Sequence, residues 1–120
     1  MMNMTKLEIG KTPANVEELL EQAFWKEKSL VPVALDFLGH IKQWQNTESS
    51  YRVSGWQGYC EKAEITQSTY HNMLKKLKNA GMVEKRYNKA VMDHQLYVSD
   101  NFSLRLNEIA GIWQKFKDLQ

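Results

Sequence analysis

One segment near the middle of the chain constrains the fold most, because it carries the start, the buried face and the end of a helix. Thr66 is a favourable residue for the N-cap of a helix. Gly81 is the residue best able to adopt the left-handed backbone that ends one. Between them, apolar side chains recur at the i, i+4, i+7 spacing of a single helix face: Tyr70, Leu74 and Leu77. The sequence therefore predicts an amphipathic helix from about Thr66 to Ala80.

The other faces of this helix are polar, and the segment around it is basic. Short or flexible side chains that can meet base edges and phosphates lie opposite the apolar face: Gln67, Ser68, His71, Asn72 and Lys75. Residues 66–89 hold six lysines and arginines against the single acid Glu84, a net charge of +5. The whole chain carries only +2, so the remaining residues sum to −3. A basic segment on a mildly acidic body suggests a footprint for a polyanion.

A first amphipathic helix is predicted to run to about Lys28. Its apolar residues recur at helical spacing: Val16, Leu19, Leu20, Ala23 and Phe24. Two starting points fit this helix. Thr12 followed by Pro13 resembles a cap and a first helical residue, whereas Asn15 with Glu18 three residues later offers a capping box.

The second helix is expected to take Ser29 as its cap, with Pro32 in its first turn. One apolar stripe lies along it: Val33, Phe37, Ile41 and Trp44. The polar stretch 45–53 indicates a loop that ends in a short strand. Ser54 is then expected to cap a short helix that ends near Lys62.

The C-terminal part is predicted to hold a hairpin and one more helix. Strands are expected over 82–87 and 95–99, joined by a polar connection. The last helix begins near Phe102 and carries one apolar stripe: Leu106, Ile109, Trp113 and Phe116. The resulting order predicts an α+β, mainly helical fold. We expect a flexible N-terminal arm over 1–12 and a single domain over 13–120.

Composition narrows the class of protein. With 42% hydrophobic and 25% charged residues, the chain has an ordinary soluble composition, and no apolar run could span a bilayer. The first eleven residues lack the apolar stretch of a signal peptide, and the single cysteine, Cys60, fits a reducing compartment, so we expect a cytoplasmic protein. His40, His94 and Cys60 lack the spacing of a metal site. No motif of an enzyme or a cofactor site is present, so we expect neither.

The run from Ile65 to Tyr87 resembles the recognition helix and first wing strand of winged helix-turn-helix regulators, of the multiple-antibiotic-resistance and PadR types. These residues sit at the matching places: Thr66, Thr69, Tyr70, Leu74, Leu77, Ala80, Gly81, Met82 and Val83. A looser match extends from Leu30 to Ser99. The resemblance implies a winged helix-turn-helix with additional N- and C-terminal helices. It also implies a transcriptional regulator that binds double-stranded DNA as a homodimer.

The resemblance implies that the helix at 66–80 enters the major groove. The residues expected to contact DNA are Thr66, Gln67, Ser68, Thr69, His71, Asn72, Lys75, Lys76, Lys85, Arg86 and Lys89. Multiple-antibiotic-resistance regulators carry Asp-x-Arg on the wing, where this chain has Asp93-His94-Gln95. Either the basic wing residue is then Lys85, Arg86 or Lys89, or the wing contributes little to binding.

Such regulators dimerise through their flanking helices, and the chain has both. The interface is expected to include Leu20, Phe24, Leu106, Ile109, Trp113 and Phe116, since exposed apolar stripes usually mark interfaces. Trp25 is expected to lie on the same surface. An alternative is that the two terminal helices pack on each other within one chain. A rival function is a winged-helix module for protein assembly without specific DNA binding, but the charge of the basic segment favours DNA.

Overall fold

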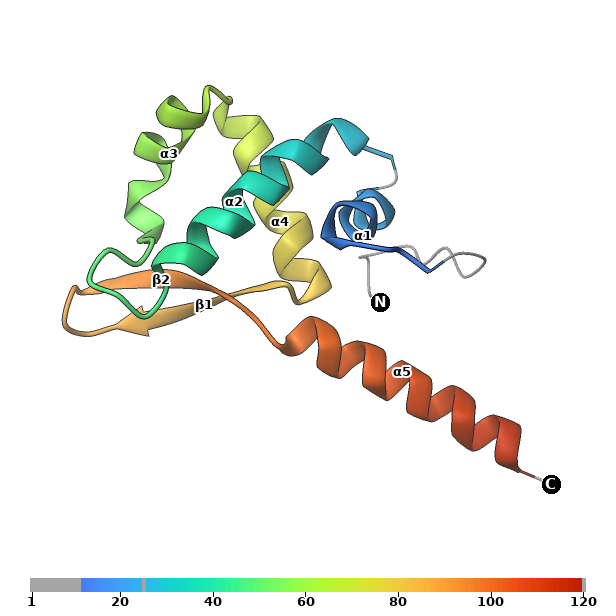
Figure 1. Cartoon of the computed structure of the whole chain (residues 1–120). Helices are drawn as coiled ribbons and strands as arrows, with labels where there is room; N and C mark the ends of the chain where they lie inside the picture. Colours follow the sequence, from blue (N-terminus) through green and yellow to red (C-terminus); the bar gives the residue numbers. More distant parts are fainter. Residues whose placement is uncertain (1–11, 25, 120) are drawn as a thin grey trace.

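The computed structural model describes residues 12–24 and 26–119. Within these ranges the chain forms five α-helices and one two-stranded sheet: α1 (Val16–Ala23), α2 (Val31–Trp44), α3 (Trp56–Ala63), α4 (Gln67–Ala80), β1 (Val83–Asn88), β2 (Asp93–Val98) and α5 (Asn101–Asp118). The helices α1 to α4 and the hairpin form a body, and α5 projects away from it (Figure 1). The predicted α+β class, dominated by helices, is confirmed.

Both ends of α4 lie where the sequence predicts them. The hydroxyl oxygen of Thr66 accepts a hydrogen bond from the backbone N–H of Thr69 at 3.1 Å, so Thr66 caps the helix. Gly81 adopts a left-handed φ of 85°, and its N–H points to the carbonyls of Leu77 and Lys78. A cap of this kind satisfies carbonyl groups that have no partner inside the helix.

Of the two predicted starting points of α1, the structure has the one at Asn15, which is the N-cap. Its side chain accepts a hydrogen bond from the N–H of Glu18 at 2.9 Å, and the Glu18 carboxylate accepts one from the N–H of Ala14 at 2.9 Å. The helix ends at Ala23, earlier than predicted, and a separate 3-10 turn occupies Lys28–Leu30. Trp25 and residues 1–11 of the arm predicted over 1–12 lie outside the described residues.

Two predicted caps are wrong because other structure takes their place. Ser29 lies inside the 3-10 turn, and α2 begins after it, with Pro32 in its first turn as predicted. Ser54 lies in a second 3-10 turn before α3. Its hydroxyl donates a hydrogen bond to the carboxylate of Asp93 at 2.5 Å, which ties this turn to the hairpin. The hydrogen bond from Ser54 lowers the pKa of the Asp93 carboxyl.

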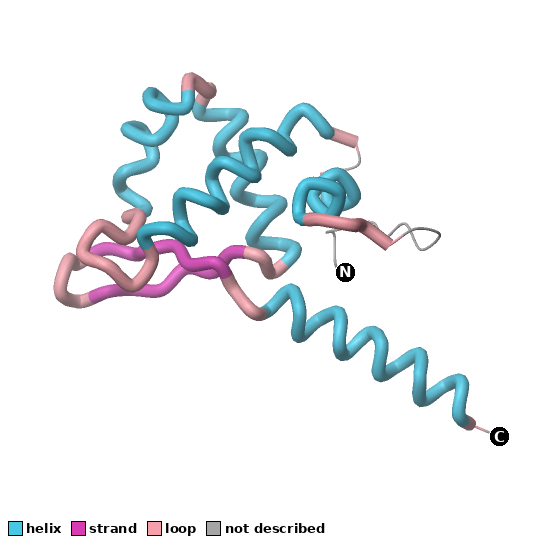
Figure 2. The backbone as a smooth tube through the Cα atoms, viewed as in Figure 1, coloured by secondary structure: helices cyan, strands magenta, loops and turns pink. Residues whose placement is uncertain are grey.

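The hairpin is antiparallel, with Val83 opposite Val98 and Asn88 opposite Asp93. The predicted short strand before α3 is reduced to an isolated bridge between Arg52 and Gln95, beside β2. Figure 2 shows the hairpin lying under the helices, with the loop after α2 close to it. The hairpin therefore gains its support from the loop and from α2 rather than from further strands.

The core lies where α1, α2, α4 and β2 meet. Its fully buried side chains are Leu20, Phe24, Ala34, Phe37, Ile41, Tyr70, Met73, Leu77 and Leu96. Phe37 occupies its centre, with edge-to-face ring contacts to Tyr51 at 5.3 Å and Tyr70 at 5.6 Å. Trp44, the last member of the predicted stripe on α2, is exposed instead.

The hydroxyl groups of Tyr51 and Tyr70 form a buried hydrogen bond in this core. Replacing Tyr51 by Phe is expected to lower the free energy of unfolding by about 1–3 kcal/mol, because the Tyr70 hydroxyl then lacks this partner. The double variant Tyr51→Phe/Tyr70→Phe should lose less than the sum of the single variants, because both polar groups are then absent. Denaturant titration of the three variants measures these differences, and strictly additive losses would contradict the pairing.

Burial also raises the pKa of both hydroxyls. The unfolded chain releases these protons near pH 10, where the folded chain still holds them. The free energy of unfolding should therefore fall as the pH rises above about 10, and it should fall less steeply in the double variant.

Candidate nucleic-acid interface

Residues 67–75 of α4 present the predicted polar face to solvent. The exposed residues on it are Gln67, Ser68, His71, Asn72 and Lys75. Two of the predicted contacts, Thr66 and Thr69, have a structural task as well, because the Thr66 hydroxyl donates to the hydroxyl of Thr69 at 3.0 Å. Thr69 is half-buried, whereas Thr66 is exposed. Residues 67–75 thus offer amide, hydroxyl, imidazole and ammonium groups on one exposed surface of α4.

A half-buried tryptophan from α3 borders this surface. The Trp56 ring stacks on Tyr70 with 27° between the ring planes, and its centroid lies 5.4 Å from that of His71. Tyr70 contacts His71 edge-on at 5.2 Å. The imidazole of His71 is therefore held between two rings of the body, although His71 itself is exposed. Trp56 was not among the predicted contacts, because only the approach of α3 to α4 brings it to this edge.

The two predicted lysine contacts of α4 differ in their surroundings. Lys75 is exposed. The ammonium nitrogen of Lys76 lies 3.7 Å from a carboxylate oxygen of Glu27, in the connection between α1 and α2. Lys76 is therefore already paired within the chain. Of the two lysines, Lys75 is the one better able to contact a phosphate.

The basic residues of β1 point to opposite faces of the hairpin, because successive strand residues alternate. Lys85 shares its face with Val83, which is buried against the helices. Arg86 lies on the other face, where its guanidinium contacts the Glu84 carboxylate at 3.0 Å and covers the ring of Tyr97 at 4.4 Å. The hydrogen bond between them raises the pKa of Arg86 and lowers that of Glu84. The structure thus separates Lys85 from Arg86.

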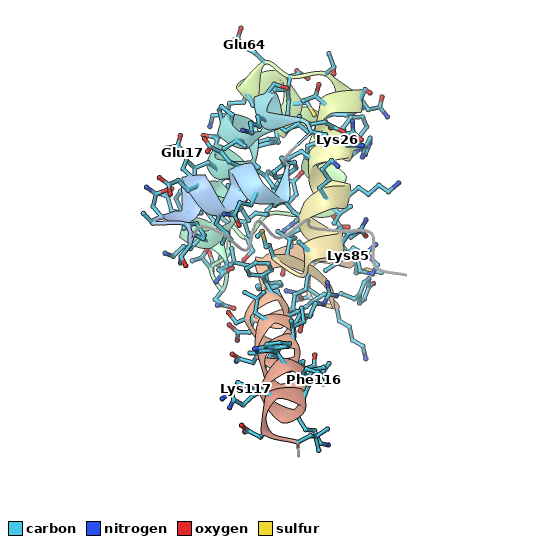
Figure 3. The ribbon with its side chains drawn as sticks, turned by 90° about the vertical axis from the view of Figure 1, so that its right-hand side faces the viewer. Glu17, Lys26, Glu64, Lys85, Phe116 and Lys117 are labelled. Atoms are coloured by element: carbon cyan, nitrogen blue, oxygen red, sulfur yellow. The ribbon has the colours of Figure 1, made fainter. Side chains whose placement is uncertain are left out.

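Lys85 lies on the same side of the body as α4. In Figure 3, Lys26 and Lys85 both lie toward α4, at opposite ends of it. Lys89 is exposed in the turn that joins the strands. Lys26 was not among the predicted contacts, because where it lies relative to α4 depends on how the connection after α1 folds back. No periodicity or motif around Lys26 predicts where it lies relative to α4.

The apolar face of α5 is uncovered. Trp113 is 61% exposed and Phe116 64% exposed, with their ring centroids 5.5 Å apart. Ile109 is also exposed, and Leu106 is half-buried. Other large apolar residues at this end of the chain are exposed as well: Leu104, Ile112 and Leu119. Figure 3 shows Phe116 far from the body.

Two predicted interface residues are wrong. Leu20 is fully buried and Phe24 is 1% exposed, because α1 packs its apolar face on the core of the same chain. The alternative in which the first and last helices cover each other is wrong too, since residues 107–119 are all exposed. Of the two helices predicted to form the interface, α5 is therefore the one whose apolar stripe is uncovered.

Two classes of site find no support in the part of the chain that the structure describes. No group of three or more His, Cys, Asp or Glu side chains there could hold a metal ion. No helix there has both the length and the apolar character that crossing a membrane requires.

Residues 12–117 match the model of a protein family described as an archaeal family. The chain belongs to this archaeal family. The matched range starts before α1 and ends one residue short of the end of α5. The match therefore covers both the body and nearly all of the projecting helix. No curated protein and no solved structure matches the chain.

Proposed function

We propose that this protein is a winged helix-turn-helix regulator that binds double-stranded DNA. In this proposal α4 is the recognition helix, α3 precedes it across a short turn, and β1 with β2 is the wing. One observation supports it most: residues 67–75 of α4 expose amide, imidazole and ammonium groups together, in a segment that carries +5 on a chain of +2. DNA recognition needs such a combination, since cations bind phosphates and amides read base edges.

The polar residues of α4 then divide into two roles. Lys75 contributes to salt-dependent attraction to the phosphate backbone, and Lys85 does the same from the wing. Gln67 and Asn72 carry side-chain amides, which can pair bidentately with the edge of an adenine in the major groove. Arg86 contributes less, because its guanidinium is engaged by Glu84 and Tyr97.

The same proposal makes the protein a homodimer through α5. A second copy of α5 would cover the exposed apolar face, of which Ile109, Trp113 and Phe116 are the central members. A two-fold dimer presents two recognition helices to successive major grooves, about 34 Å apart along the duplex. The free, buried thiol of Cys60 agrees with a cytoplasmic location, where thiols stay reduced.

Two substitutions on α4 separate affinity from specificity. Lys75→Ala should weaken binding to a selected site and to a scrambled duplex about equally, and should reduce the log–log salt slope by about 1. Asn72→Ala should cost about 1–3 kcal/mol on the selected site and little on the scrambled duplex. The selected site is first obtained from a random DNA pool, and both affinities are then measured across a salt series.

Matched controls lie on α5, outside the apolar face. Lys115→Ala and Asn107→Ala remove the same side chains from exposed positions, and both should leave the two affinities unchanged. If Lys75→Ala and Asn72→Ala also changed neither affinity, α4 would not read DNA. The protein-assembly function would then be the better proposal.

A further inference from the structure

The attachment of α5 to the body is confined to its first two turns. Phe102 is half-buried and packs against the core, and Arg105 and Leu106 are half-buried. Every residue from 107 to 119 is exposed. The direction in which α5 leaves the body is therefore set by a few contacts near its N-terminus.

Those contacts are made to the end of α4. The N–H of Phe102 donates to the carbonyl of Gly81 at 2.9 Å, just after the helix. The guanidinium of Arg105 donates from Nη1 to the carbonyl oxygen of Asn79 at 2.5 Å, in the last turn of α4. Close packing accompanies these bonds, because a Cβ on Gly81 would lie 3.2 Å from the Arg105 Cζ.

Arg105 suits this position for two physical reasons. The last carbonyls of a helix have no partner within it, so a donor from outside satisfies them. The C-terminus of a helix also carries a partial negative charge, which favours a cation. The arginine thereby links the last turn of α4 to the second turn of α5 by a side chain, and Phe102 adds a backbone bond beside it.

We propose that Arg105 is a positioning residue that holds α5 at a fixed angle to α4. Resting on the proposed function, it thereby sets the separation of the two recognition helices in the dimer and the half-site spacing that the protein accepts. The helix acts as a lever: its 18 residues extend about 27 Å, so a swing of about 10° at its base displaces the far end by about 5 Å. A displacement of that size exceeds the rise of about 3.4 Å per base pair of a duplex.

The angle can be measured without DNA, between spin labels at Asn72→Cys on α4 and Lys115→Cys on α5. Cys60→Ala removes the native thiol, and dilution with unlabelled protein restricts the measurement to pairs within one chain. Lys115 lies about 15 Å along α5 from Arg105. Arg105→Ala should broaden the distance distribution by about 5 Å, since that corresponds to a swing of about 20° at this lever length.

Two further variants control the spin-label experiment. Arg105→Lys retains a cationic donor, so it should restore much of the narrow distribution. Lys117→Ala removes another cation from the exposed end of α5 and should leave the width unchanged. An Arg105→Ala distribution as narrow as that of the parent protein would overturn the positioning role, whatever the protein does with DNA.

Duplexes with two half-sites at varied spacing test the consequence. The parent should prefer one spacing, and Arg105→Ala should flatten this preference while binding to a single half-site changes less than about twofold. A profile as sharp as the parent's, despite broadened label distances, would overturn the link to spacing. A parent that binds no DNA overturns the proposed function and that link together, and the label distances still decide whether Arg105 holds α5.

Discussion

Replacing Ile109 and Trp113 together by aspartate is expected to convert a homodimer into a monomer of 14.1 kDa. Both side chains are large, apolar and about half or more exposed, on a helix whose last two-thirds consists of exposed residues. A second α5 that covers them would bury four carboxylates in the double variant, and unpaired buried charge is strongly unfavourable. Light scattering at micromolar protein measures the mass directly.

The same variant should lose much of its affinity for a duplex with two half-sites. Linked domains gain about 10²–10⁴ in avidity from simultaneous binding, and a monomer forfeits that gain. Binding to a single half-site should change little, because α4 is untouched. This second measurement distinguishes loss of dimerisation from damage to the proposed recognition helix, α4.

A matched control is available on the same helix. Asn107→Asp/Gln114→Asp adds the same two negative charges at exposed positions outside the stripe of Ile109, Trp113 and Phe116. That variant should keep the mass of the parent. A parent protein that already has a mass of 14.1 kDa would show that α5 is not a dimer interface at that concentration.

Gly81→Val is expected to lower the free energy of unfolding by at least about 1 kcal/mol. Gly81 has a φ of 85°, a region that a β-branched residue rarely adopts. The new Cβ would also lie 3.1 Å from the backbone nitrogen of Phe102 and 3.2 Å from the Arg105 guanidinium carbon. The backbone strain and the steric crowding both destabilise the folded state, and both arise where α5 contacts the end of α4.

Gly39→Val provides the control for this prediction. Gly39 lies within α2, and a Cβ there would meet no atom within 4 Å. Valine has a better helix propensity than glycine, so Gly39→Val should leave the stability unchanged or slightly raised. Thermal or denaturant unfolding compares the two variants, and equal stabilities of Gly81→Val and Gly39→Val would contradict the assigned role of Gly81.

Much of the framework around the candidate interface could be predicted from local sequence. Thr66 and Gly81 predict the ends of α4 because caps depend on one side chain or one backbone conformation. The alternation of Tyr70 and Leu77 with polar residues predicts its buried face for the same reason, since helical periodicity is a property of neighbours along the chain. The apolar stripe on α5 was predicted in this way too.

Sequence could not predict which partner each face would find. Ser54 looks like a helix cap, but its hydroxyl is engaged by Asp93, which is remote in sequence. Leu20 and Trp113 both lie on amphipathic helices that resemble interface helices, yet the first is fully buried and the second is 61% exposed. Amphipathicity indicates that a face will be covered, and it carries no information on whether the cover comes from the same chain.

The sequence by itself therefore determined the helices, the hairpin and the basic, polar face of α4, because these follow from contacts between residues a few positions apart. The tertiary structure decided the rest. Strand register separated Lys85 from Arg86, and the fold of the connection after α1 brought Glu27 to Lys76 of α4. The guanidinium of Arg105 reaches the last turn of α4 only because Gly81 turns the chain and the hairpin returns it to that point. Such contacts join residues distant in sequence, and no local pattern specifies which distant residues will meet.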